Sequence, residues 1–127
     1  SFLFFINTNI DNFNRNEYHF SNLCFGASLR AIIDLMEEKN FKFVGTNLAR
    51  CNAFFILEKY LDKINVEIPN KNNLSNHTDS NIRESRDQSG KLNYISGDER
   101  IKSIYECDIV DLNDNKIKKI KSFFETT

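Results

Sequence analysis

The sequence has little cysteine, glycine or proline and no tryptophan. Its 127 residues include three cysteines, four glycines and one proline. Cys24, Cys51 and Cys107 are far apart and form no C-x-x-C pair, which favours reduced thiols in a cytosolic protein over a disulfide framework. Because His19 and His77 also stand alone, the sequence predicts no zinc site.

The chain also lacks a strong net charge and a long apolar run. Its formal net charge is −1, which gives no overall basic field for nucleic acid. No apolar run approaches the ~20 residues that a membrane span needs. The run Phe2–Ile6 is too short for the core of a signal peptide. We therefore expect a cytoplasmic protein, one domain or part of one in size, that binds neither nucleic acid nor membrane.

What the sequence does contain is one strong amphipathic helix. Charged residues alternate with apolar ones between Ala27 and Lys39, and Asn40 tolerates the left-handed conformation that ends many helices. The apolar residues recur at helical spacing, so the sequence predicts a helix at Ala27–Lys39 that docks on a sheet. The stripe consists of Phe25, Leu29, Ile32, Ile33 and Met36.

The predicted sheet has three apolar strands. Phe41–Gly45 and Cys51–Ile56 are separated by a short gap, so we expect them to be antiparallel. Ala53–Ile56 is continuously apolar, which predicts a strand covered on both faces inside a larger sheet. Phe2–Ile6 has the same character and predicts a buried parallel strand. Because one helix cannot cover this sheet, we expect a piece of a larger α/β domain, or a chain that covers its sheet by association.

The later part of the chain predicts shorter elements. We expect residues 1–63 to form the α/β unit and residues 64–127 a loop-rich tail, because Ile64–Gly90 loses its periodicity. The predicted elements are a helical turn at Leu57–Lys63, a strand at Leu92–Ile95, a helix at Asp98–Glu106 and a hairpin of Asp108–Leu112 with Lys116–Ile120.

The polar loop after the first strand is the predicted substrate side. In open α/β sheets, ligands bind beyond the carboxyl ends of the strands. Asn7, Tyr18 and His19 lie in the loop that leaves such an end, so we take them as substrate-binding candidates. The alternative for His19 is a packed ring, because it lies between Tyr18 and Phe20.

Two charged clusters have a structural and a functional interpretation each. Arg83–Asp87 is interpreted as a solvated loop, and the weaker alternative is that its arginines bind a phosphate or carboxylate. The lysines of the last predicted strand indicate a solvated face that discourages edge pairing. A nucleic-acid patch is the weaker alternative, because it requires a basic domain. These lysines are Lys116, Lys118, Lys119 and Lys121.

Several segments resemble a known family. Gly26–Leu29, Phe43–Asn47 and Asn52–Ile56 resemble the carboxyl-terminal half of FkbM-like methyltransferase-type proteins. Arg83–Arg86 with Leu92–Gly97 resembles the tail of the same group. These proteins are similar to class I S-adenosylmethionine-dependent methyltransferases, and many occur with sugar and surface-glycan biosynthesis.

The resemblance implies a partial Rossmann-like methyltransferase sheet. Phe2–Ile6 is then the fifth strand, Ala27–Lys39 the next helix, and Phe41–Gly45 with Cys51–Ile56 the terminal antiparallel pair. In such folds a Gly-rich turn after the first strand holds S-adenosylmethionine, and the four glycines here form no such turn. The resemblance therefore implies that the intact domain binds this cofactor and that this chain alone does not.

Two classes of function follow. The first is a fragment of a methyltransferase-like protein that acts on a sugar or surface-glycan precursor and is inactive alone, with its catalytic residues unknown. The second is a non-catalytic chain that pairs through its uncovered sheet, with another copy or with a partner subunit. The sequence assigns the small-molecule or glycan substrate to the intact domain only.

Overall fold

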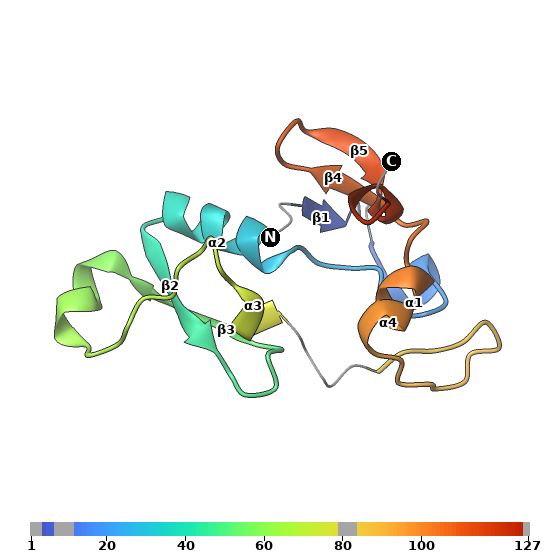
Figure 1. Cartoon of the computed structure of the whole chain (residues 1–127), viewed down its shortest axis with the longest axis horizontal. Coiled ribbons are helices and arrows are strands. Elements are labelled where there is room, and N and C mark those ends of the chain that lie inside the picture. Colours follow the sequence, from blue (N-terminus) through green and yellow to red (C-terminus); the bar gives the residue numbers. More distant parts are fainter. Residues whose placement is uncertain (1–3, 7–11, 79–83, 126–127) are drawn as a thin grey trace. The chain divides into compact units, whose positions relative to one another are not determined.

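The computed structural model describes residues 4–6, 12–78 and 84–125, and these residues divide into two units (Figure 1). The helix–hairpin unit consists of residues 28–78. The disulfide unit consists of residues 4–6, 12–27 and 84–125. The predicted boundary at residue 63 does not separate these units, because residues 4–6 and 12–27 belong with residues 84–125.

The helix–hairpin unit begins with α2, Leu29–Glu38. The hydroxyl oxygen of Ser28 caps this helix by accepting a hydrogen bond from the backbone N–H of Ala31 at 3.2 Å. Asn40 follows the end of the helix in the left-handed conformation, with φ of 63°. The predicted helix is therefore confirmed, with a later start because Ser28 is its cap.

Two antiparallel strands follow, β2 (Phe41–Thr46) and β3 (Ala53–Leu57). Their pairing confirms the predicted antiparallel connection. The prediction that the second strand lies inside a larger sheet is wrong for the described residues, where β2 and β3 form a two-stranded sheet. Phe54 in β3 is 52% exposed, so the continuously apolar run does not indicate cover on both faces here.

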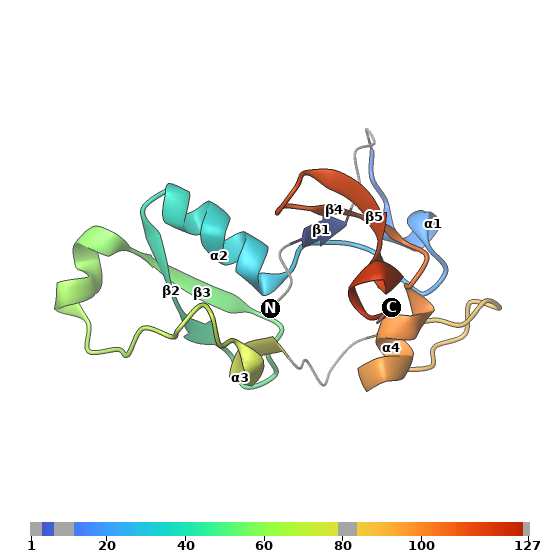
Figure 2. The ribbon, with the colours of Figure 1, turned by 45° about the horizontal axis from the view of Figure 1, so that its top comes forward.

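The core of the helix–hairpin unit lies between α2 and the two strands (Figure 2). Ile33, Phe43 and Leu74 are buried there, and the rings of Phe43 and Phe55 lie 5.7 Å apart. Leu74 brings the segment after the strands into the same core. The Lys71 ammonium also pairs with the Glu37 carboxylate at 2.7 Å, so this segment is held to the outer face of α2.

Two short helices complete the helix–hairpin unit. The 3-10 helix η1, Glu58–Lys63, confirms the helical turn predicted after the second strand. The helix α3, Ser75–Thr78, lies in the segment predicted to be a loop. Its His77 ring packs edge-on against Phe43 with the ring centroids 5.3 Å apart, which explains why a polar segment is ordered there.

The disulfide unit contains a three-stranded antiparallel sheet. Its order is β1 (Phe4–Ile6), β4 (Asp108–Asp111) and β5 (Lys116–Lys119). The predicted hairpin of β4 and β5 is confirmed. The predicted parallel strand is wrong, because β1 pairs antiparallel with β4. Within the described residues, the chain is thus a mix of helices and strands with two small antiparallel sheets.

Most of the predicted lysine face of β5 is ion-paired. Lys118 contacts the carboxylates of Asp111 and Asp114, and Lys119 pairs with Asp108 at 2.7 Å. Asp111 is only 4% exposed, so its pairing with Lys118 satisfies a buried carboxylate at the start of the turn.

The remaining helices of the disulfide unit are short. They are α1 (Arg15–Tyr18), α4 (Gly97–Ser103) and the 3-10 helix η2 (Ile120–Phe123). The α4 helix confirms the predicted helix in a shorter form. The predicted strand Leu92–Ile95 is wrong, because only Leu92 makes a bridge, with Arg86.

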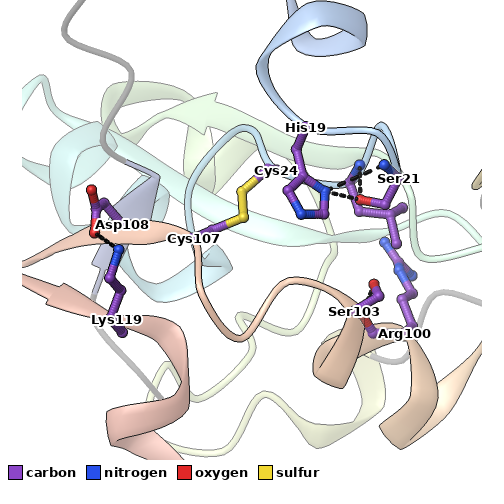
Figure 3. The surroundings of a disulfide bond; sticks show 9 residues. His19, Ser21, Cys24, Arg100, Ser103, Cys107, Asp108 and Lys119 are labelled. Atoms are coloured by element: carbon purple, nitrogen blue, oxygen red, sulfur yellow. Dashed lines mark hydrogen bonds and ion pairs between the residues drawn. A yellow bond between two sulfur atoms is a disulfide. The ribbon is translucent and has the colours of Figure 1, made fainter. Parts of the chain in front are cut away.

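A disulfide joins Cys24 to Cys107 in the core of this unit (Figure 3). Both cysteines are buried together with Ile109 and Ile120. The prediction of reduced thiols is therefore wrong for this pair, because spacing along the sequence does not reveal which cysteines meet in space. Cys51 is a free and exposed thiol. A cytoplasmic location stays a prediction. The expectation of reduced cysteines no longer supports it, because Cys24 and Cys107 form a disulfide.

Candidate functional site

The structure describes two of the three predicted substrate-binding residues, Tyr18 and His19, and neither lines the cleft described below. Asn7 lies outside the described residues. Tyr18 ends α1 and packs against the buried cluster that contains Cys24. His19 follows directly and is half-buried. Tyr18 is thus a core contact rather than a residue of an open surface.

His19 is held by its neighbours in the chain (Figure 3). Its Nδ1 atom accepts from the backbone N–H of Ser21 at 3.3 Å and lies 2.7 Å from the Ser21 hydroxyl oxygen. An Nδ1 that accepts from an N–H carries no proton, so the hydroxyl donates to it as well. The ring also lies 4.4 Å from that of Phe20. Burial lowers the pKa of His19, which keeps the ring neutral.

This serine–histidine pair does not form an exposed nucleophile. Ser21 has no solvent exposure, and its oxygen also accepts from the backbone N–H of Leu23 at 3.2 Å. A nucleophile must reach its substrate, so the pair instead fixes the bend after α1. The packed-ring alternative for His19 is the one that this geometry favours.

An open cleft of about 640 Å³ lies in the disulfide unit, next to this bend. Its size is in the range of small-molecule sites. One wall is the segment around α1, and the other is the turn over residues 84–90. The lining residues are Arg15, Asn16, Phe20 and Asn22 on the first wall, and Glu84, Arg86, Gln88, Ser89 and Gly90 on the second.

The second wall is shaped by the side chain of Asp87. Its Oδ1 atom accepts from the Ser89 hydroxyl at 2.6 Å and from the backbone N–H of Lys91 at 3.0 Å. These bonds, the Ser89 hydroxyl first, lower the pKa of Asp87. Gly90 takes the left-handed conformation, with φ of 85°, that closes the turn. The ionised carboxylate of Asp87 therefore holds this wall in place by accepting hydrogen bonds from Ser89 and Lys91.

Arg86 is the most strongly positioned cation of the cleft. Its Nη1 donates to the Gly90 carbonyl oxygen at 2.8 Å, and its Nη2 donates to a Glu84 carboxylate oxygen at 3.1 Å. The backbone N–H of Arg86 donates to the carbonyl oxygen of Ser21 at 3.2 Å. This last bond joins the two segments that form the walls.

Arg15 supplies a second guanidinium to the same cleft. It lies on α1, whose start is capped by the Asn14 side chain accepting from the backbone N–H of Asn16 at 3.0 Å. The Arg15 guanidinium carbon lies 4.9 Å from the centroid of the Phe25 ring. No carboxylate among the described residues is within ion-pair distance of Arg15. Two guanidinium groups beside neutral amides make this cleft suited to an oxyanion.

The sequence favoured a solvated loop for Arg83–Asp87, with anion binding as the weaker alternative. Arg86 of this cluster lines the cleft, while Arg83 lies outside the described residues. Arg15 and Asn22 were missed. Their sequence shows no signal for the cleft, because their meeting with the turn 84–90 depends on tertiary contacts.

The described part of the chain offers neither a metal cluster nor a helix suited to crossing a membrane. No group of three or more His, Cys, Asp or Glu side chains in residues 4–6, 12–78 and 84–125 is arranged to hold a metal ion. None of the helices in those ranges has the length and apolar character that crossing a bilayer requires.

Comparisons of the chain with protein-family models, curated proteins and solved structures find no match. The resemblance to FkbM-like methyltransferases therefore stays a prediction.

Proposed function

We propose that this chain is the acceptor-binding part of a methyltransferase-like protein that works on a sugar or surface-glycan precursor. The cleft of the disulfide unit carries the proposal. It combines two guanidinium groups, three side-chain amides and the half-exposed ring of Phe20, a combination that suits a sugar bearing an anionic group. The intact domain would hold S-adenosylmethionine, and this chain alone would not.

The helix–hairpin unit supports the methyltransferase part of the proposal. Two of the resembling segments, Phe43–Asn47 and Asn52–Ile56, lie along β2 and β3, after α2 and in the implied order. In the proposed Rossmann-like sheet, an open edge of this strand pair would accept strands from the rest of the domain.

Two titrations test this proposal. We expect S-adenosylmethionine to bind the natural protein at its full length and not the isolated chain, when followed by calorimetry. We expect a hexose phosphate to bind the isolated chain. If the full-length protein does not bind S-adenosylmethionine, the proposed methyltransferase function is refuted. If the chain binds no sugar, its proposed role in binding the acceptor is refuted.

The outer face of the β2–β3 sheet favours a second function. Because side chains alternate along a strand, Phe54 and Ile56 point away from the α2 side on which Phe55 packs. This apolar face and the open strand edges would let two copies of the chain pair as a non-catalytic assembly. Sedimentation should then show a dimer that Phe54→Ser disrupts, whereas a wild-type monomer at all concentrations would exclude self-pairing.

A further inference from the structure

We infer that the cleft binds the phosphate group of a phosphorylated sugar through Arg15 and Arg86. The inference rests on the proposed use of the cleft for an acceptor, and it adds the chemical class of that acceptor. It draws on the contacts of three residues, Arg15, Asn22 and Arg86, all of which line the cleft.

Arg86 is oriented for an oxyanion by a contact that the ligand need not disturb. The Gly90 carbonyl oxygen holds Nη1 at 2.8 Å, and Glu84 occupies Nη2 at 3.1 Å. The Glu84–Arg86 pair is solvent-exposed, with side-chain exposures of 51% and 37%. Exposed pairs of this kind contribute little to stability. A phosphate, which carries more charge than a carboxylate, can therefore replace Glu84 on Arg86 while Gly90 keeps the guanidinium in place.

Arg15 can bind the same ligand without losing an ion pair. Its guanidinium carbon lies 4.9 Å from the centroid of the Phe25 ring, and none of its N–H donors is hydrogen-bonded within the described residues. The N–H donors of a guanidinium point outward in its plane, so they stay available for phosphate oxygens. The described part of the chain offers no carboxylate to compete for them.

Asn22 provides an independent reason to expect a ligand. It is only 8% exposed and lines the cleft, yet its side-chain amide has no hydrogen-bond partner among the described residues. A buried polar group without a hydrogen-bond partner is energetically unfavourable. A ligand oxygen that accepts from the Asn22 amide would remove this penalty on binding.

The rest of the lining fits the sugar part of the ligand. Phe20 is 41% exposed and offers an apolar surface to a sugar ring. Asn16 and Gln88 offer amides that can both donate to and accept from hydroxyl groups. The lining carries two guanidinium groups against the single carboxylate of Glu84, so its charge favours an anion.

Isothermal titration of the full chain with inorganic phosphate, a hexose phosphate and the free hexose tests this inference. Arg15→Gln and Arg86→Gln should each weaken phosphate and hexose-phosphate binding by about 10- to 100-fold, the effect of one lost charge-assisted hydrogen bond. Glu84→Gln should tighten binding of both, because it removes the competing carboxylate. Lys102→Gln on α4 removes one positive charge outside the cleft and should change affinity less than twofold.

Arg15→Gln should weaken phosphate binding and Glu84→Gln should tighten it, and this contrast decides the outcome. Equal phosphate affinity in the wild type, Arg15→Gln and Glu84→Gln would overturn the inference, and these two variants decide it even where Arg86→Gln does not fold. Equal losses in Lys102→Gln and Arg15→Gln would show non-specific charge attraction and would also overturn it. Binding of the free hexose as tightly as the hexose phosphate would refute the phosphate site but leave acceptor binding intact, whereas the cofactor titration tests methyl transfer separately.

Discussion

The carbonyl oxygen of Ser21 accepts a hydrogen bond from the backbone N–H of Arg86 at 3.2 Å. This bond links the two walls of the cleft, which come from segments more than sixty residues apart in the printed sequence. Three residues after Ser21, Cys24 is joined to Cys107 next to β4. The disulfide thus anchors the segment that carries the first wall, and the cleft depends on it.

Breaking the disulfide should destabilise the disulfide unit. The bond closes a loop between residues 83 positions apart, so Cys24→Ala with Cys107→Ala should lower the free energy of unfolding by about 2–5 kcal/mol. Hydrogen exchange should show faster exchange of amides in β4 and β5, with those in β2 and β3 unchanged. Cys51→Ser, at an exposed thiol, is the control and should have an effect of under about 0.5 kcal/mol. Unchanged protection of β4 after reduction would contradict this account.

Two positions on α2 should respond very differently to truncation. Ile33 is 1% exposed and Leu35 is 52% exposed, and both have four-carbon side chains. Ile33→Ala should lower the stability of the helix–hairpin unit by about 2–5 kcal/mol, because it leaves a cavity beside Phe43. Leu35→Ala should change it by less than about 0.5 kcal/mol. Denaturant unfolding of both variants measures this, and similar losses would show that α2 does not pack on the sheet as described.

The β4–β5 hairpin should lose stability in acid. The hydrogen bond from Lys118, more than the backbone bond from Asn113, lowers the pKa of Asp111 from its ordinary value of 3.8. Because the folded pKa is the lower one, the unfolded chain takes up protons first as the pH falls. The stabilisation is therefore complete above pH 3.8 and is lost as the pH falls through the lower folded pKa.

An acid titration by NMR checks this directly. Asp111→Asn should reduce the acid-induced loss in the hairpin and leave the part that comes from Asp114, because Lys118 also lowers the pKa of that carboxyl. Glu125→Gln, at an exposed position, is the control and should leave the loss unchanged. If the Asp111 carboxyl titrates above 3.8, its pKa is raised by folding rather than lowered, which would contradict this account.

His19 should titrate below 6.5, because burial lowers its pKa from that value. Protonation is then more favourable in the unfolded chain, so the disulfide unit should lose stability as the pH falls below 6.5. Phe20→Ala removes the ring that lies 4.4 Å from His19 and should raise its pKa toward the ordinary value. Phe54→Ala, in the other unit, should leave it unchanged. A wild-type His19 that titrates at or above 6.5 by NMR would show that the ring is not buried.

The local elements of this fold could be predicted from the sequence. The apolar period within Ala27–Lys39 indicates a helix, and Asn113-Asp114-Asn115 between alternating residues indicates a hairpin. These signals lie within a few residues of the structure that they produce. The failed strand Leu92–Ile95 shows their limit, because the backbone N–H of Ile95 donates to the buried Ser85 hydroxyl oxygen instead of a neighbouring strand.

Long-range partners could not be predicted in the same way. The apolar run that forms β1 gives no sign of whether its neighbour runs parallel or antiparallel, and that neighbour, β4, lies about a hundred residues later in the printed sequence. The spacing of Cys24 and Cys107 does not reveal their contact either. The cleft has the same origin, since Arg15 and Arg86 line it together only because distant segments pair.

The central claim is that the cleft of the disulfide unit is the functional site. Two-dimensional NMR of the full chain during titration with a hexose phosphate tests it most directly. We predict that the amide signals of Arg15, Asn22 and Arg86 shift together with one saturating dependence on ligand, while those of β2 and β3 do not move. Shifts confined to β2 and β3, or no shift in the cleft at any ligand concentration, would contradict the claim.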